Sequence, residues 1–378
     1  MAIYLKKFET QAAYEAAESS LILPNVSLTV DNNAVHYKPY VEPIETRVVA
    51  KFNVTDTSNP TKIGYYGYTS GFSSIEIDGV EQPSVVSAYT FSTTGEHTVK
   101  YTLTDQTTIG NYAFTNCNAI TSVTIPNSVT TIGWNAFNQC TSLTSIDVPN
   151  NVTTIGSYAF QECTGLTTCT IGSGVTRIGM TVLGYCRSLT SLTVNNNNTV
   201  YDSRNECNAI IETSTNKLIQ GCQNTVIPNG VTSIGDSAFR SCSGLTSIVI
   251  PDSVTSIGNS AFEYCTSLTS CTIGSGVTSI AQYAFNNCTS LTSIDIPSGA
   301  TWIGDSAFYR CNGLMNVTVN PTTPPRLGEY CDDDDNCYYR NFDNNASGRK
   351  IYVPSESVEV YKSTNGWKAY ASNIQAIS

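Results

Sequence analysis

The fourteen cysteines of this 378-residue chain have the widest chemical scope of its residues, because a thiol can form a disulfide, bind zinc or act as a nucleophile. No two of them are spaced as C-x-x-C, and the chain has only two histidines, His36 and His97. Zinc sites need close groups of Cys and His, and a nucleophilic thiol needs a neighbouring base. We therefore expect no metal, no cofactor and no catalytic thiol.

Eight of the cysteines recur at a single position of an internal repeat, which predicts an interior row of reduced thiols, because free cysteine is among the residue types most often buried. They are Cys117, Cys140, Cys163, Cys186, Cys242, Cys265, Cys288 and Cys311. For two other pairs of cysteines, a disulfide remains an alternative. Cys207 and Cys222 flank a segment between repeats, and Cys331 and Cys337 lie in a late loop.

Carboxylates offer a second chemistry. The run from Asp332 to Asp335 has the oxygen ligands that calcium prefers, but it lacks the alternating order of an EF-hand loop. We expect a solvated acidic loop there, with calcium binding as the alternative. The acids of the repeats are scattered over exposed positions, and no pair stands out for glycoside hydrolysis. The sequence therefore predicts a protein that is not an enzyme.

Charge and hydropathy exclude two classes of partner. The formal net charge is −11, and only 13% of the residues are charged, against about 25% in an average soluble domain. An acidic, lysine-poor chain neutralises few phosphates, so we expect no nucleic acid partner. No run of 18 apolar residues is present, so we expect no membrane insertion. The first ten residues lack the apolar core of a signal peptide, and we expect none in this chain.

The elements that hold these residues come from a repeat of 23 residues, T-x-I-G-x-x-A-F-x-x-C-x-x-L-T-S-h-x-h-P-x-x-V, in which h is apolar. Ile146 and Val148 alternate with a polar residue, as in a half-buried strand. The apolar residues between Ile132 and Cys140 favour one short helix. Such units bury a core only by stacking, so residues 106–320 predict a solenoid. Copies begin at Thr107, Thr130, Thr153, Thr176, Thr232, Thr255, Thr278 and Thr301.

The I-G-x-x-A-F-x-x-C-x-x-L core and the repeat length resemble the BspA-like branch of the leucine-rich repeat family. The resemblance covers Thr107 to about Asn320. It implies a leucine-rich repeat solenoid with a β-strand plus a short helix per coil. The fourth copy departs from the pattern between Met180 and Leu183, and Ala281 replaces glycine in the seventh. Residues 195–227 interrupt the array; we expect a β-hairpin there, with a degenerate coil that lacks its helix as the alternative.

Three further domains are expected outside the array. Residues 1–44 predict a strand (3–8), a helix (10–18) and a hairpin that turns at 31–33. Residues 45–105 alternate apolar and polar side chains between turns, which favours an all-β immunoglobulin-like sandwich ahead of the solenoid. His97 is expected to face solvent on one of its strands. Residues 321–378 predict an acidic loop and a C-terminal cap that covers the open end of the stack.

Comparison of the copies with one another indicates a binding surface. The exposed strand positions are almost uniformly Thr or Ser, whereas the exposed positions on the helix-side edge vary and carry aromatic residues and arginine, the side chains favoured at interfaces. Unconstrained drift on a solvent face is the alternative explanation. The candidate partner-binding residues are Tyr112, Trp134, Tyr158, Tyr185, Arg240, Tyr264, Tyr283 and Tyr309.

These observations predict a non-enzymatic binding or adhesion protein that uses an extended solenoid surface. The resemblance implies adhesion, so the expected partner is a protein or glycan on another cell or a host surface. The alternative role is a structural or receptor-binding component of a phage or phage-like particle. In both cases we expect an extracellular location, on a cell or virion surface.

Overall fold

The computed structural model describes residues 4–8, 36–40, 46–64, 71–332 and 337–377, and the chain divides into two compact units, Met1–Thr46 and Arg47–Ser378. In the first unit, β1 (Tyr4–Phe8) pairs with β2 (His36–Tyr40) as an antiparallel ladder. β1 matches the strand expected over residues 3–8. The expected helix over 10–18 and the turn at 31–33 lie outside the described residues.

The second unit begins with one antiparallel sheet of the order β10-β3-β8-β5-β6. Its inner face covers the first coil, since the rings of Phe72 and Tyr101 lie 5.4 and 4.9 Å from the ring of Phe114. The immunoglobulin-like sandwich expected for 45–105 is therefore not confirmed. Alternating side chains specify a half-buried sheet, but they do not specify what covers it, and here the solenoid does. The strands are β3 (Val48–Val54), β5 (Phe72–Ile77), β6 (Val80–Glu81), β8 (Gly95–Leu103) and β10 (Ile120–Thr124), beside a separate pair, β4 (Thr61–Lys62) and β7 (Ala88–Tyr89).

His97 is a correction at the level of one residue. It lies on β8 but is only 9% exposed. Its Nδ1 is 2.6 Å from the Asp78 carboxylate, and its Nε2 is 2.9 Å from the Thr93 carbonyl oxygen. Burial alone would lower the pKa of His97, but these hydrogen bonds raise it above the ordinary value. The polar ring is buried because both of its nitrogens have partners.

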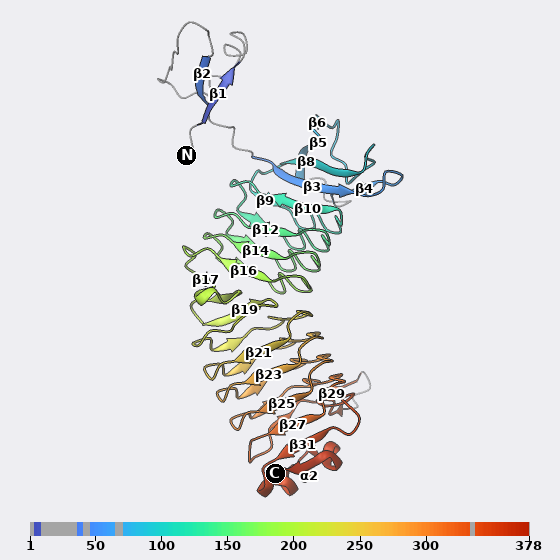
Figure 1. Ribbon diagram of the computed structural model, residues 1–378, viewed down its shortest axis with the longest axis vertical. Coiled ribbons are helices and arrows are strands. Elements are labelled where there is room, and N and C mark those ends of the chain that lie inside the picture. The colour runs from blue at the N-terminus through green and yellow to red at the C-terminus, as the bar shows by residue number, and fades with distance from the viewer. Residues whose placement is uncertain (1–3, 9–35, 41–45, 65–70, 333–336, 378) are drawn as a thin grey trace. The chain divides into compact units, whose positions relative to one another are not determined.

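The repeats stack as coils, and each coil contributes short parallel strands to ladders that run along the stack (Figure 1). Equivalent residues pair in register, as in Ile132 with Ile155. One ladder consists of β9 (Thr108–Ile109), β11 (Thr131–Ile132), β13 (Thr154–Ile155) and β15 (Arg177–Ile178), and resumes with β20 (Ser233–Ile234), β22 (Ser256–Ile257), β24 (Ser279–Ile280), β26 (Trp302–Ile303) and β28 (Arg326–Leu327). The other consists of β12 (Ser145–Asp147), β14 (Thr168–Ile171) and β16 (Ser191–Val194), then β21 (Ser247–Ile250) and β23 (Ser270–Ile273), then β25 (Ser293–Ile296), β27 (Asn316–Val319), β31 (Lys350–Val353) and β32 (Ile374–Ala376).

The short helix expected in each coil is absent from the described repeats, and this prediction is wrong. The segment from Gly133 to Cys140 forms successive turns, in which Ala136 N–H donates to Gly133 and Asn138 N–H to Asn135. The amides between them donate to the next coil instead, as Phe137 N–H does to the Ala159 carbonyl at 2.8 Å. A backbone in which every second N–H bonds to the next coil cannot make the i to i−4 hydrogen bonds of a helix. We call this side of the solenoid, residues 133–140 and their equivalents, the turn-side edge.

The turns require left-handed backbone at two positions of each of the eight repeat copies, and none of those residues is glycine. Such φ values cost an L-residue about 1–2 kcal/mol each. Contacts with the neighbouring coils must offset that cost. The residues are Tyr112, Asn116, Asn135, Gln139, Tyr158, Glu162, Thr181, Tyr185, Ser237, Ser241, Ser260, Tyr264, Tyr283, Asn287, Ser306 and Arg310.

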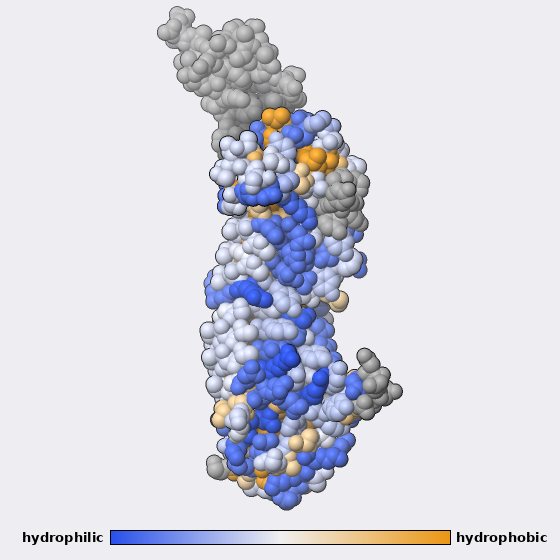
Figure 2. All heavy atoms as spheres, turned by 90° about the vertical axis from the view of Figure 1, so that its right-hand side faces the viewer, coloured by the Kyte–Doolittle hydropathy of each residue, from blue (hydrophilic) through white to orange (hydrophobic). Residues whose placement is uncertain are grey.

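The core of the solenoid is a stack of phenylalanine rings beside a row of thiols. Successive rings, such as Phe239 and Phe262, lie 4.8 Å apart and nearly parallel. Cys140 donates its S–H to the Phe114 carbonyl at 3.2 Å, and other coils repeat this bond. All eight repeat cysteines are buried free thiols, so the prediction of an interior row is confirmed. Outside, the face in Figure 2 is mainly hydrophilic, as the abundance of Ser, Thr and Asn implies.

The interruption at 195–227 contains the expected hairpin, β18 (Ala209–Glu212) with β19 (Lys217–Gly221), flanked by β17 (Tyr201–Asp202). Because β19 also pairs in parallel with β20, the hairpin's second strand serves as the strand of a shortened coil. Both alternatives left open by the sequence therefore hold. Cys207 and Cys222 remain free thiols.

The last coil is covered by a small C-terminal group of helices and strands. The 3₁₀ helix η5 (Trp367–Asn373) places Trp367 and Tyr370 against the ring of Phe342, and the α-helix α2 (Val358–Ser363) places Tyr361 against the ring of Trp367. Two further 3₁₀ turns are η3 (Arg204–Glu206) and η4 (Ser355–Ser357). Cys331 and Cys337 form a disulfide between β29 (Tyr330–Cys331) and β30 (Cys337–Tyr338). Of the acidic run, only Asp332 belongs to the described residues.

Candidate binding surface

Three of the candidate residues form a continuous aromatic row on the turn-side edge. The rings of Tyr112 and Trp134 lie 5.4 Å apart, and those of Trp134 and Tyr158 lie 6.4 Å apart. Trp134 is 46% exposed, and the two tyrosines are half-buried. Neighbouring coils therefore build one aromatic surface with accessible ring area, the type of surface that anchors interfaces. We call these three residues the aromatic row.

A second group of candidates meets across the interruption. The Arg240 guanidinium lies 5.3 Å from the centre of the Tyr185 ring, and Arg240 Nε is 3.0 Å from Glu263 Oε2. Burial raises the pKa of the Tyr185 hydroxyl. Tyr264, at 39% exposure, lies one residue beyond Glu263. Tyr185 and Arg240 are 55 positions apart in the sequence, and the shortened coil brings their two full coils close enough for this contact.

The remaining two candidates, Tyr283 and Tyr309, lie near the C-terminal end, where the sequence analysis missed a partner. The Arg340 guanidinium lies 5.5 Å from the Tyr309 ring centre and 3.2 Å from that of Tyr330. Arg340 follows the disulfide loop, outside the repeat, so comparison of the repeat copies could not find it.

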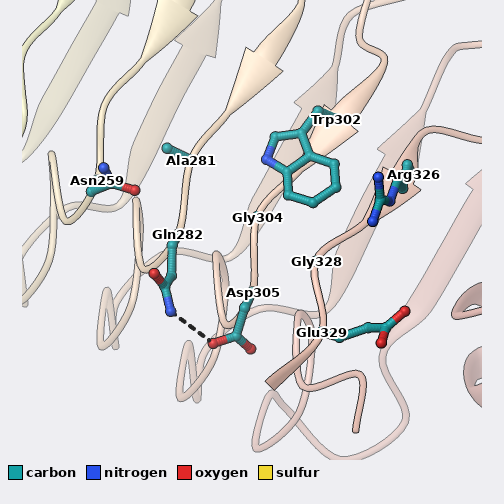
Figure 3. A pocket seen from close by; sticks show the side chains of 9 residues that line it. All are labelled: Asn259, Ala281, Gln282, Trp302, Gly304, Asp305, Arg326, Gly328 and Glu329. Carbon is teal, nitrogen blue, oxygen red and sulfur yellow. Dashed lines mark hydrogen bonds between the residues drawn. The ribbon is translucent and has the colours of Figure 1, made fainter. Parts of the chain in front are cut away.

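A pocket of about 420 Å³ near β26 and β28 was also missed (Figure 3). The Arg326 guanidinium lies 5.1 Å from the centre of the Trp302 ring, and Gln282 Nε2 donates to Asp305 at 3.2 Å. Glu329 completes the polar lining. The sequence signal was available, because Trp302 occupies a position where the other copies have Thr, Ser or Arg.

A larger pocket, of about 540 Å³, opens on the turn-side edge at the interruption. Tyr158 and Arg240 both line this pocket, so the pocket adjoins the aromatic row and the contact between Arg240 and Tyr185. Its apolar lining includes Ile178, Ile219 and Met180, and Met180 is 68% exposed. Pockets that bind ligands commonly measure about 300–1,000 Å³.

The threonine-rich strand side is arranged differently, because one threonine hydroxyl in each of several coils bonds within the fold. Thr144 Oγ1 donates to the Thr121 carbonyl at 3.2 Å, and Thr167 Oγ1 donates to Thr144 at 2.9 Å. Thr190 continues the series. Hydroxyls that bond the preceding coil have less capacity for a ligand, so their uniformity is explained by stacking of the coils.

Among the described residues, one group of side chains has the composition of a metal site. Glu329, Cys331 and Cys337 bring their ligand atoms within 4.8 Å of one another. Both sulfurs belong to the disulfide, so neither can act as a thiolate ligand. In the described part of the chain, no helix has the length and apolar character needed to cross a membrane.

A match to a protein-family model supports the fold. The model of the BspA type leucine-rich repeat region, in six copies, matches residues 84–211 and 210–331. No curated protein matches the chain. A leucine-rich cell surface protein from Faecalibacterium prausnitzii is 27% identical, over 67% of this chain and 83% of its own, with a TM-score of 0.40. The pneumococcal vaccine antigen PcpA is 16% identical, over 73% and 84%, with a TM-score of 0.47. Since the family model spans more than half of the residues, the chain belongs to the BspA-type leucine-rich repeat family.

Proposed function

We propose that this protein is a non-enzymatic binding protein that recognises a protein or glycan on another cell or a host surface through its turn-side edge. The observation that carries the proposal is the aromatic row. Tyr112, Trp134 and Tyr158 come from three successive coils and are in ring contact, although the fold requires no aromatic residue at their positions.

Two features support the choice of this edge. The aromatic and arginine side chains cluster where residue types vary from coil to coil, whereas several strand-side threonine hydroxyls donate to neighbouring carbonyls. Adjacent exposed aromatic rings form apolar area that favours a partner. A role at a cell or virion surface fits a binding surface of this kind, and the similar Faecalibacterium prausnitzii protein is itself described as a cell surface protein.

The test compares two triple variants of the full chain. The edge variant carries Trp134→Ala, Tyr158→Asn and Tyr185→Asn, with asparagine chosen because it tolerates the left-handed backbone of both tyrosines. The strand variant carries Thr144→Val, Thr167→Val and Thr190→Val. Binding is measured on glycan arrays, on arrays of extracellular proteins and on whole cells.

We expect the edge variant to lose at least tenfold in affinity for the bound partner with little change in Tm, and the strand variant to retain binding. Loss of binding in the strand variant alone would show that the wrong face was chosen. Localisation of the native protein by immunogold labelling separates a cell-surface binding protein from a component of phage particles.

A further inference from the structure

The pocket of about 420 Å³ at β26 and β28 extends along the stack. Its lining begins at Asn259 in the sixth copy and ends at Glu329 in the coil after the eighth. These lining residues come from four successive coils, and the steps of about 4.8 Å between neighbouring strands add up to a length of about 14 Å. The pocket is also open to solvent. We call it the Trp302 pocket.

The two sides of the Trp302 pocket differ in chemistry. Figure 3 shows Trp302 and Arg326 on one side of Gly304, and Asp305 and Glu329 on the other. Because Gly304 has no side chain, the floor between the two sides is bare backbone. One side therefore offers an aromatic ring with a cation, and the other offers carboxylates.

The Trp302 ring provides the apolar part of the lining. In its ladder Trp302 pairs with Ser279 on one side and with Arg326 on the other. Among the described residues, only the Arg326 guanidinium stacks on this ring, at 5.1 Å from the ring centre. The ring is half-buried, and its indole N–H has no hydrogen-bond acceptor in the described part of the chain. Trp302 can therefore contribute both ring area and a donor to a ligand.

The carboxylates provide acceptors on the opposite side. Asp305 is only 4% exposed, and its two oxygens accept from Gln282 Nε2 at 3.2 Å and from Ser306 Oγ at 2.9 Å. An ionised carboxylate has about four acceptor positions, so these two bonds leave capacity for a ligand. Glu329 is exposed, and its Oε1 accepts from the Tyr339 hydroxyl at 2.6 Å.

Arg326 adds donors and sets the balance of charge. Its guanidinium forms no ion pair or side-chain hydrogen bond among the described residues, although Asp305 and Glu329 line the same pocket. A ligand must therefore donate to the carboxylates and accept from the guanidinium. Hydroxyl groups do both. An anion would be repelled by the two carboxylates, and a cation by Arg326, so the lining favours a neutral ligand.

We propose that the Trp302 pocket binds a neutral sugar residue within a glycan chain. A pyranose ring has an apolar C–H face and a rim of hydroxyls. Its C–H face packs on the Trp302 ring, its hydroxyls donate to Asp305 and Glu329, and a sugar oxygen accepts from Arg326. The length of the pocket leaves room for the neighbouring sugars of the chain. The inference goes beyond the proposed function, because the aromatic row lies in the first three copies and this site lies in the last coils.

The experiment uses the indole signals of the full chain. The protein has three tryptophans, so NMR spectra of isotope-labelled protein contain three indole N–H signals, and the signal lost in Trp302→Ser belongs to Trp302. Serine is chosen because Ser256 and Ser279 occupy the same position in the two preceding copies. The probes are the methyl glycosides of glucose, galactose, mannose and N-acetylglucosamine, and oligosaccharides of the same sugars. Sialic acid and glycylglycine are the charged comparisons.

We expect at least one neutral sugar to shift the Trp302 signal and to leave those of Trp134 and Trp367 unchanged. The matching oligosaccharide should bind at least fivefold more tightly than the methyl glycoside, because it occupies more of the pocket. In calorimetric titrations, Trp302→Ser and Asp305→Asn should each lower the affinity at least tenfold. Trp302→Phe is the matched control, since it keeps an aromatic face, and should lower the affinity less than about threefold.

Four results would overturn the inference. They are no shift of the Trp302 signal with any neutral sugar, tighter binding of sialic acid or glycylglycine there, full affinity in Trp302→Ser, and a methyl glycoside that binds as tightly as the oligosaccharide. The last result would assign the pocket to a free sugar. The signal of the native chain decides the first two results even if a variant does not fold.

The edge variant separates this inference from the proposed function. It leaves Trp302, Asp305 and Arg326 in place, so it should bind the same sugar with unchanged affinity. If no sugar binds the Trp302 pocket, the inference fails, and the proposed function still stands or falls on the partner that the edge variant loses.

Discussion

At the scale of single residues, the row of thiols sets the chemical limits of the fold. Burial raises the pKa of Cys117, Cys163 and Cys311 to about 12, and it also raises the pKa of Cys140 and Cys288 well above the ordinary value. A thiol in unfolded chain ionises near pH 8.5. Because the thiolate is the nucleophile, the folded protein protects its cysteines from alkylation and metal binding while it stays folded.

The raised pKa values of the buried thiols predict that the protein unfolds at alkaline pH. A group whose folded pKa is raised stabilises the fold below its unfolded pKa, and that contribution is lost as the pH rises toward the folded pKa. Above pH ~8.5, each fully buried thiol then lowers the free energy of unfolding by more than about 1 kcal/mol per pH unit. Twelve free cysteines are buried, and domains are stable by only about 5–15 kcal/mol. We expect unfolding near pH ~10, measured by circular dichroism.

Thiol alkylation provides the control for this prediction. Labelling should stay slow up to the pH of unfolding and then become complete. Replacing Cys140, Cys163 and Cys265 by alanine should move the unfolding midpoint to higher pH. A free energy of unfolding that stays constant up to pH 11 would contradict the raised pKa values of these thiols.

At the scale of the element, the turns explain why each coil has its form. Every coil places two residues in the left-handed region, and alternate amides leave the coil to pair with the next one. A helix would keep those hydrogen bonds local and leave its neighbours unbonded. The turn is therefore stable only within the stack, as expected of repeat proteins.

Ser260 tests the backbone requirement directly. Its φ is 53°, and its N–H donates to Gln282 at 2.9 Å. Ser260→Val places a β-branched residue in the left-handed region and should lower the free energy of unfolding by about 1–2 kcal/mol. Ser260→Asn, the matched control, should change it by less than about 0.5 kcal/mol. Denaturant unfolding measures both, and equal effects of the two variants would contradict the assignment.

At the scale of the whole solenoid, the interruption joins two hydrophobic cores. One core extends from Val48 to Cys222, and the other from Cys207 to Ile374. The phenylalanine stack is broken between Phe160 and Phe239, because Leu183 stands in the fourth coil and Gly221 takes the place of a ring in the shortened one. In a repeat protein, cooperative unfolding depends on the interfaces between neighbouring repeats. We therefore expect the coupling between neighbouring coils to be weakest at this junction.

Gly221 provides the test of that junction. A Cβ at this residue would lie 2.1 Å from the Phe239 ring, so Gly221→Ala must displace one of the two. We expect the variant to lower Tm and to separate the calorimetric unfolding of the two cores. Gly299→Ala is the control, because its Cβ would meet only the Ser275 carbonyl, at 3.5 Å. A single unchanged transition in Gly221→Ala would show that the coupling of the two cores does not depend on this contact.

Much of this architecture was predictable from the sequence, because stacking forces equivalent residues into equivalent environments. The register of Ile132 with Ile155 and the buried thiols follow from the repeat, and the hairpin follows from two apolar runs on either side of a polar turn in the interruption. The turns did not, since the spacing of Ile132, Ala136, Phe137 and Cys140 fits a helix equally well. Hydrogen bonds between coils decide that choice, and no local pattern encodes them.

The candidate surface was predictable only in part, for the same reason. Comparison of copies identified the aromatic row and Arg240, which the structure brings into contact with neighbours in other coils. It could not identify Arg340, which lies outside the repeat. Trp302 differs from the Thr, Ser or Arg of the other copies, but its contact with Arg326, in a later segment, could not be foreseen. The 540 Å³ pocket is lined by residues on both sides of the interruption, and only the stacking of the coils brings them together.

The hydrogen bonds between coils also determine how the solenoid responds to mechanical load. Backbone and threonine hydroxyl bonds both run from one coil to the next, as from Thr153 to Thr130 and from Thr176 to Thr153. A pull along the stack therefore loads them a few at a time, and coils detach in turn rather than together. Each coil has 23 residues and lengthens the chain by roughly 75 Å when it is extended. Under tension the solenoid can thus act as an extensible tether that dissipates work coil by coil.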